Sequence, residues 1–434
     1  MSENINNRSK GSQHGSDEAI QPANKEQRKE EVSWKIFFIW TLVFILIFGA
    51  FVCLDLAYEK PLYKETQKFV PDIQDKDSFM DYFMVIIGEL GESFGIIATC
   101  WIAANILPFS ESCFLLISVG ACLYINGILK ILYHAPRPFF DTPKIEALSC
   151  STSYGNPSGH AMYFSFPFPL VFILLFRSQI KEKKYILPAI FGALTIAICG
   201  LALFGRIYLG VHSIDQVIYG CTLGLTLLVY FVFVLYKPLM GYIHMFTRRK
   251  CSRNEIIVHL SINLLMVLLV LTTIAVIAYV LNITTHDDPS EWNTAVELKC
   301  SKSNLKENSI FVRKALRNIF APIGIFGCFG GIILYSYYAP TIVDKYLNNN
   351  VWVVLGRLGV SLLCMLPFVP LLLIPSSAPF VVLLIFAELL MSFSFTIVLY
   401  FLGRLLMVKI KLFTPVKDVE AEIEMSDNKV EASH

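Results

Sequence analysis

Three short stretches of this chain contain the residue types that phosphoryl transfer requires. They are Lys130 with Arg137-Pro138 seven residues later, the run Pro157-Ser158-Gly159-His160, and Arg206 with His212 six residues later. Fixed cations bind phosphoryl oxygens, free backbone N–H groups donate to them, and histidines can act as nucleophile and acid. No stretch is sufficient alone, but together they predict a site for phosphate chemistry.

The second stretch is typical of the beginning of a helix. Asn156 is a favourable N-cap and Pro157 suits the first helical position. The N–H groups of Ser158, Gly159 and His160 would then be unpaired and directed at an anion, and Gly159 would let the backbone approach phosphate closely. His160 would sit at the rim, where it could protonate a leaving oxygen. The alternative is an ordinary helix cap with a surface histidine.

The first stretch supplies two cations of different shape. Lys130 ends an apolar segment, and Pro136 and Pro138 predict a break in the chain around Arg137. Arg137 offers a planar fork to two phosphate oxygens, whereas Lys130 offers a point charge. The alternative is that Lys130 merely extends its head from the end of a membrane span towards water while Arg137 is a loop charge.

The third stretch lies in a turn between two apolar segments. We expect His212 and Asp215 to open the following helix, where a spacing of three residues puts them on one face. The carboxylate of Asp215 could keep one imidazole nitrogen protonated and leave the other free to attack phosphorus. Alternatively, Asp215 is only a first-turn acidic residue that the helix dipole favours.

Composition indicates an all-α polytopic membrane protein. Hydrophobic residues make up 55%, charged residues only 16%, and the mean hydropathy is +0.59. About ten apolar segments are long enough to cross a bilayer as helices. These are 34–54, 82–106, 112–133, 159–176, 185–204, 211–236, 257–281, 319–339, 351–374 and 378–403. The net charge of +2 points to no nucleic-acid partner.

The predicted spans divide the chain into four parts. We expect a disordered tail over 1–33, a six-helix membrane core over 34–236 with the motifs within 130–216, four carboxyl-terminal helices over 257–403, and a second tail over 404–434. Basic residues are more frequent in the segments on the side of both termini, which predicts cytoplasmic termini. All three motifs then fall at the opposite, lumenal ends of their helices.

Cysteines and acidic residues give two further expectations. Most of the 11 cysteines lie inside apolar segments and have no metal-ligand spacing, so we expect them to pack as small apolar residues. Cys150 and Cys300 fall in loops on the predicted lumenal side, which leaves a disulfide between them open. Glu89 and Glu92 interrupt the second segment and could line the entrance to the site.

At the level of these motifs, the chain resembles the type 2 phosphatidic acid phosphatase and glucose-6-phosphatase superfamily of membrane phosphatases, over about residues 80–236. The resemblance implies that His212 is the nucleophile that forms a phosphohistidine and that His160 is the general acid. It also implies that no metal or cofactor is required. By the same resemblance the phosphate cradle consists of Lys130, Arg137, Ser158, Gly159 and Arg206.

Two departures from the family pattern bear on function. Gly205 replaces the usual serine before the arginine, and Gln216 occupies the usual aspartate position, so that Asp215 falls one residue early. With glutamine at position 216, the sequence is similar to glucose-6-phosphatases. The run 208–214 and the four carboxyl-terminal spans instead resemble sphingosine-1-phosphate phosphatases.

From these resemblances we expect hydrolysis of a lipid phosphate monoester, of phosphatidate or sphingoid-base type, in the endoplasmic reticulum or another endomembrane. A glucose-6-phosphatase-like sugar phosphatase, a non-catalytic lipid-binding relative and a transporter remain as alternatives. A homodimer in contact with membrane lipids is left open.

Overall fold

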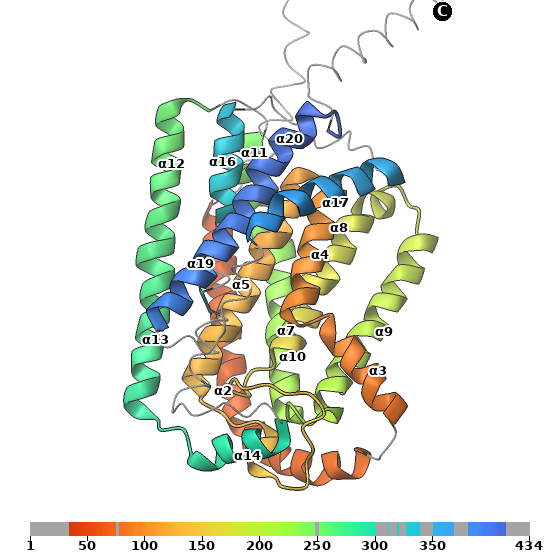
Figure 1. Ribbon diagram of the computed structural model, residues 1–434, viewed down its shortest axis with the longest axis vertical. Helices are drawn as coiled ribbons and strands as arrows, with labels where there is room; N and C mark the ends of the chain where they lie inside the picture. The colour runs from red at the N-terminus through yellow and green to blue at the C-terminus, as the bar shows by residue number, and fades with distance from the viewer. Residues whose placement is uncertain are drawn as a thin grey trace, which may run out of the picture.

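The computed structural model describes residues 34–74, 78–247, 251–300, 311, 319–320, 327–338, 350–368 and 381–413. Within these ranges the chain forms helices joined by loops, and no strand occurs in them. The expectation of an all-α membrane bundle is confirmed (Figure 1). The predicted tail over 1–33 lies outside the described residues.

The amino-terminal part of the bundle carries all three motifs. Its helices are α2 (Trp34–Ile73), α3 (Ser78–Glu89), α4 (Ser93–Ile106), α5 (Phe109–Tyr133), α6 (Pro138–Asp141), α7 (Gly159–Ser165), α8 (Pro167–Lys181), α9 (Ile186–Tyr208), α10 (Ile214–Val229), the π-helical segment η1 (Tyr230–Leu235) and α11 (Tyr236–Thr247). Helix α10 packs against α7 and α2, and α3 packs against α9.

The carboxyl-terminal helices lie against this core rather than apart from it. They are α12 (Arg253–Leu265), η2 (Met266–Leu271), α13 (Thr272–Thr285), α14 (Ser290–Cys300), α16 (Gly327–Tyr338), α17 (Val351–Met365), η4 (Leu366–Phe368), α19 (Val381–Ile397), η5 (Val398–Leu402) and α20 (Gly403–Lys409). Helix α13 contacts α5, α14 contacts α6, and α17 contacts α4.

The described residues contain 8 helices long and apolar enough to span a membrane, or up to 9 if the bent pair α3–α4 counts as one span. That pair is the predicted span 82–106, and it bends by 50°. The predicted span 319–339 falls partly outside the described residues. Helix α20 continues to Lys409 and buries Arg404, so the first residues of the predicted tail 404–434 are helical, and 414–434 lie outside the described residues.

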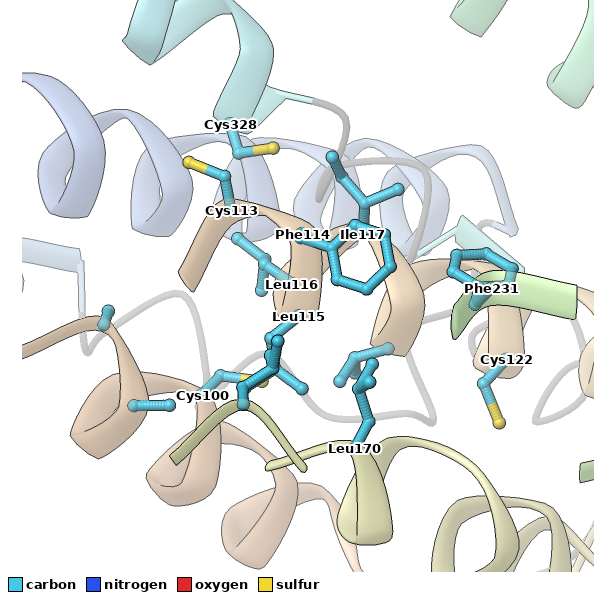
Figure 2. Close-up of a cluster of buried hydrophobic side chains, with 14 of the residues drawn as sticks. Cys100, Cys113, Phe114, Leu115, Leu116, Ile117, Cys122, Leu170, Phe231 and Cys328 are labelled. Atoms are coloured by element: carbon cyan, nitrogen blue, oxygen red, sulfur yellow. The ribbon is translucent and has the colours of Figure 1, made fainter. Parts of the chain in front are cut away.

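The largest apolar cluster surrounds α5 and contains several of the cysteines. Figure 2 shows Phe114 and Cys113 of α5 beside Phe231 of η1 and Cys328 of α16. The rings of Phe114 and Phe231 lie 6.0 Å apart. Neither Cys113 nor Cys328 is in a disulfide and both are buried, so these two cysteines pack as small apolar residues, as expected. In a bilayer such packing stabilises mainly through van der Waals contact.

Candidate active site

The three motifs meet at one end of the bundle. The last turn of α5, the first turns of α7 and α10, and the last turn of α9 converge there, near α14 at the lower edge of Figure 1. Helix α20 lies towards the opposite end of the picture. This convergence agrees with the expectation that all three motifs share one face of the membrane.

Arg137 is held by neutral oxygens of the loop that follows it. It precedes α6, and its Nε donates to the Ser153 carbonyl at 2.6 Å. Its Nη2 donates to Ser153 Oγ at 3.0 Å and to the Tyr154 carbonyl at 3.3 Å, and Nη1 donates to the Val211 carbonyl at 2.7 Å. The side chain is buried. The guanidinium is therefore fixed in place while its charge stays unneutralised.

Lys130 uses the same loop. Its Nζ donates to the Tyr154 carbonyl at 2.7 Å and approaches the Gly155 carbonyl at 3.4 Å. Helix α5 ends three residues later, where His134 adopts a left-handed conformation (φ 45°) that turns the chain towards Arg137. Because Lys130 and Arg137 share the Tyr154 carbonyl, their charged heads lie side by side, as the sequence predicted.

Arg206 completes the group of cations and has spare donors. It lies in the last turn of α9 and is buried, and its Nε has no hydrogen-bond partner among the described residues. A buried guanidinium with an unused N–H is costly unless a ligand supplies an acceptor. None of the salt bridges within the described ranges involves Lys130, Arg137 or Arg206. The three form a buried cationic cluster that suits a phosphoryl group.

The helix start in the second motif differs from the expectation. The N-cap is Ser158, not Asn156, and α7 begins at Gly159. The Ser158 N–H donates to the Gln216 carbonyl at 3.0 Å, so this amide is not available to an anion. The Gly159 and His160 amides still lack an acceptor one turn earlier within α7. A Cβ at Gly159 would lie 3.0 Å from Asn126 Oδ1, which indicates close packing there.

His160 carries a proton on Nε2. Its Nε2 lies 3.1 Å from the Gly88 carbonyl, and a carbonyl oxygen can only accept a hydrogen bond. Nε2 must therefore be the protonated nitrogen, as an acid requires. The Glu92 carboxylate lies 3.6 Å from the same nitrogen. The expected entrance residue Glu92 thus reaches the site.

His212 has the opposite arrangement. Its Nε2 lies 3.1 Å from Arg137 Nη1, which can only donate, so Nε2 is the unprotonated nitrogen. Its Nδ1 lies 3.1 Å from Gln216 Oε1. The amide orientation follows from the other end of the side chain, because Gln216 Nε2 donates to the Pro136 carbonyl at 2.8 Å. Gln216 Oε1 therefore accepts a hydrogen bond from Nδ1–H, and Nε2 stays unprotonated with its lone pair directed at Arg137 Nη1.

The expected role of Asp215 does not match this geometry. Asp215 is fully buried, its carboxylate oxygens have no hydrogen-bond partner among the described residues, and its charged neighbours are Asp55 and Glu59 of α2. Gln216 folds back instead, because its Oε1 also accepts from the Ser213 N–H at 3.3 Å. This capping contact brings position 216 to the imidazole and turns position 215 towards α2.

The electrostatic environment keeps His212 neutral. Burial lowers the pKa of His212 well below its ordinary value, and the positive charges of Arg137, Lys130 and Arg206 lower it further. At neutral pH the imidazole is thus an uncharged base, unprotonated at Nε2, beside three fixed cations. This combination suits nucleophilic attack on phosphorus.

The sequence did not single out several residues that build the site. Ser153, Tyr154 and Pro136 act through backbone oxygens, for which no residue type is diagnostic. Gly88 reaches His160 from α3, a helix without a motif. Gln216 could have been found from the sequence, because it occupies the position at which the family pattern has its aspartate.

The fold and the site define an integral membrane protein with a buried cluster of three cations beside two histidines, of which His160 is protonated and His212 unprotonated at Nε2. Residues 111–240 match the PAP2 superfamily, and this segment includes all three motifs. The chain therefore carries a PAP2 superfamily domain in its membrane bundle.

Two curated relatives and one solved structure are similar to the chain. Dolichyldiphosphatase of Saccharomyces cerevisiae is 28% identical over 129 residues, which cover 30% of this chain and 54% of that protein. Phosphatidylglycerophosphatase B of Bacillus subtilis is 30% identical over 118 residues, covering 26% and 52%. The chain thus spans about half the length of the curated relatives it matches.

The solved structure is the PAP2-type phosphatidylglycerolphosphate phosphatase of Bacillus subtilis, a transmembrane protein. It is 23% identical, with a TM-score of 0.37, and the match covers 45% of this chain and 96% of that one.

Proposed function

We propose that this protein is a membrane phosphatase that hydrolyses a lipid phosphate monoester through a phosphohistidine at His212. The observation that carries the proposal is the state of His212: Nδ1–H is held by Gln216, while Nε2 is unprotonated and directs its lone pair at Arg137 Nη1, 3.1 Å away. The two relatives bear the names of phosphatases, and one is named for a phosphorylated lipid monoester.

In the first step, Nε2 of His212 attacks phosphorus. The N–P bond forms and the P–O bond to the lipid alcohol breaks. His160 enters this step as the imidazolium, transfers its Nε2 proton to the leaving oxygen and becomes neutral. Lys130, Arg137 and Arg206 hold the equatorial phosphoryl oxygens, and the N–H groups at the start of α7 add to this cradle. Gly159 and His160 supply these N–H groups; Ser158, which the sequence placed in the cradle, instead donates its N–H to the Gln216 carbonyl and caps α7.

In the second step, water replaces the imidazole. The His160 ring is now neutral and unprotonated at Nε2, so it accepts a proton from water as the water oxygen attacks phosphorus. The N–P bond breaks and inorganic phosphate is released. The sum is the conversion of a phosphate monoester and water into an alcohol and phosphate. The three cations serve both steps because the phosphoryl oxygens carry the charge throughout.

The mechanism assigns no step to a metal ion. The cations of Lys130, Arg137 and Arg206 supply the charge stabilisation that metal ions provide in other phosphoryl-transfer enzymes. We therefore expect EDTA to leave phosphate release by the purified protein unchanged. Loss of activity that a divalent cation restores would contradict this mechanism.

A lumenal orientation of the site is part of the proposal. Cys150 and Cys300 form a disulfide on the same side of the bundle as the motifs, and disulfides form in oxidising compartments such as the lumen of the endoplasmic reticulum. This supports cytoplasmic termini, as does the distribution of basic residues. An engineered glycosylation acceptor in the exposed loop at Lys144 should become modified, whereas one near Glu182 should not.

The function can be tested by phosphate release from detergent-purified protein, with His212→Ala as the blank. The panel contains a sphingoid-base phosphate, phosphatidate, a polyprenyl diphosphate and glucose-6-phosphate. Release from a lipid monoester that the blank lacks, together with acid-labile, alkali-stable phosphate on the protein, is the expected result. Preference for glucose-6-phosphate would favour the sugar phosphatase. Lipid binding without release would favour a non-catalytic relative.

A further inference from the structure

The break between α3 and α4 forms one wall of the site. The two helices meet at an angle of 50°, and the break consists of Leu90, Gly91 and Glu92. Broken helices at membrane depth are tolerated only where the freed backbone lines protein or a watery cavity. Here the break lies against His160 at Gly91, and the Gly88 carbonyl in the last turn of α3 lies 3.1 Å from His160 Nε2. Its backbone therefore belongs to the surroundings of the proposed acid.

Two glycines make this close approach possible. A Cβ at Gly91 would lie 2.6 Å from His160 Cδ2, a distance that real side chains do not adopt. A Cβ at Gly88 would lie 3.2 Å from Arg206 Nη1. The break thus lies directly against the proposed acid, and the last turn of α3 lies close to one of the three cations.

Within the α3–α4 break, Glu92 is the residue whose charged side chain reaches the site. Its carboxylate lies 3.6 Å from His160 Nε2, and it does not cap α4 with its side chain. The carboxylate lies within electrostatic range of Lys130, Arg137 and Arg206 together. The side chain is 47% exposed, whereas that of His160 is 10% exposed. Glu92 is therefore the more exposed of the two groups and lies at the outer edge of the site.

Exposed apolar side chains lie along the chain at the same outer edge of the site. Leu90 is 41% exposed, Phe94 81% and Ile97 38%, and they flank Glu92 along the chain. Exposed apolar side chains on a membrane helix face lipid, so a hydrocarbon chain can lie beside the carboxylate. A carboxylate bordered by apolar groups suits a substrate that has a positive charge close to its phosphate and a long alkyl chain beyond it.

We propose that Glu92 selects lipid phosphates that carry an ammonium group next to the phosphoester, the class of long-chain 2-amino alcohol phosphates. The inference rests on the proposed function. The three cations hold the phosphoryl group and His160 faces the leaving oxygen, so Glu92 stands beside the carbons that follow that oxygen. An ammonium there meets a carboxylate, whereas the second phosphate of a diphosphate would meet a like charge and be disfavoured.

The test compares two substrates that differ only in charge. We would measure kcat/KM for a sphingoid-base phosphate and for its N-acetyl derivative, in which the ammonium is a neutral amide. Wild-type protein should prefer the free amine, and Glu92→Gln should reduce that preference about fivefold, the scale of a partly exposed ion pair. The same variant should raise the relative rate on a polyprenyl diphosphate. Because the two lipids are compared on one protein, partial misfolding does not affect the ratio.

Glu89→Gln is the matched control. Among the three cations Glu89 lies within electrostatic range of Arg206 alone, so its removal should shift the ratio by less than about twofold. Equal loss on both lipids in Glu92→Gln would mean that Glu92 acts through His160, and would overturn the proposal while leaving the phosphatase intact. Absence of release from every substrate by wild-type protein would overturn the proposed function and this inference with it.

Discussion

Gln216 Oε1 lies 3.1 Å from His212 Nδ1, and this contact determines which imidazole nitrogen faces the phosphoryl site. The glutamine is itself oriented by the Pro136 carbonyl, which accepts from its Nε2 at 2.8 Å. A backbone oxygen between the first two motif cations thus sets the tautomer of a histidine in the third motif. The motifs are coupled through hydrogen bonds that do not involve the substrate.

Gln216→Leu should reduce kcat by about 100-fold, because the imidazole loses the acceptor that keeps Nδ1 protonated; removal of an orienting group costs on this order or more. The measurement is steady-state phosphate release. Whether the variant still forms the phosphohistidine is the second readout.

Asp215→Asn is the control on the adjacent residue, and it should cost less than about tenfold because its carboxylate faces α2. If the asparagine variant lost as much activity as Gln216→Leu, the assignment of the orienting role to Gln216 would fail.

The pH dependence should reflect the lowered pKa of His212. A nucleophile must be unprotonated, so a lowered pKa keeps it active as the pH falls below about 6.5, the ordinary value for histidine. The acid limb of kcat/KM should therefore lie well below that pH. Lys130→Gln removes one of the charges that lower the pKa and should move the limb to higher pH, whatever its effect on the maximal rate.

The same shift has a consequence for stability. The unfolded chain binds a proton at His212 near its ordinary pKa, whereas the folded chain does not. Stability should therefore fall as the pH decreases below about 6.5 and continue to fall until the lower folded pKa is reached. In His212→Asn this contribution should be absent. Identical acid profiles of thermal inactivation for the two proteins would argue against a neutral, buried imidazole.

The motif residues could be predicted from the sequence, because their chemistry fixes residue types and spacing. Lys130, Arg137 and His212 are brought together as expected. Asp215 was the wrong neighbour to choose for the imidazole contact. A three-residue helical spacing assumes that both residues lie on the helix, but His212 precedes α10, and the cap geometry at Ser213 brings position 216 back instead.

The contribution of the α3–α4 break could be predicted only in part. Glu92 was recognisable as a carboxylate within an apolar segment, but its distance from His160 depends on the packing of helices that are far apart in the sequence. The contact of Gly88 depends on a backbone carbonyl, which leaves no trace in residue type. The Cys150–Cys300 disulfide was one open pairing, and the structure confirms it.

The disulfide should stabilise the loop that holds Arg137 and Lys130. Cys300 ends α14, and Lys299 beside it donates to the carbonyls of Phe139, Thr142 and Ile145 at 2.8–3.0 Å. Burial in this contact lowers the pKa of Lys299. The double variant Cys150→Ser, Cys300→Ser should lose about 2–5 kcal/mol of stability, measured as a lower temperature of half-inactivation.

The single serine variants should resemble the double one, since either removes the bond. Lys299→Met should lower the same temperature by less, because it leaves the covalent link in place. If the double variant inactivated at the wild-type temperature, the α14 contact would not contribute to holding the loop.

Gly91→Ala should reduce kcat at least tenfold without removing any reacting group. The added methyl would lie 2.6 Å from His160 Cδ2 and 2.8 Å from Phe164 Cε2, so either the histidine or the α3–α4 break must shift. A displacement of the acid by a fraction of an ångström misaligns its proton with the leaving oxygen, and such misplacement alone can cost orders of magnitude.

Gly49→Ala on α2 is the matched control, because nothing lies within 4 Å of its added methyl and it should behave as wild type. A substrate with a better leaving group, such as an aryl phosphate, needs less help from the acid and should recover much of the rate in Gly91→Ala. Equal losses on alkyl and aryl phosphates would mean that the methyl disturbs the phosphate cradle through Arg206 rather than the acid.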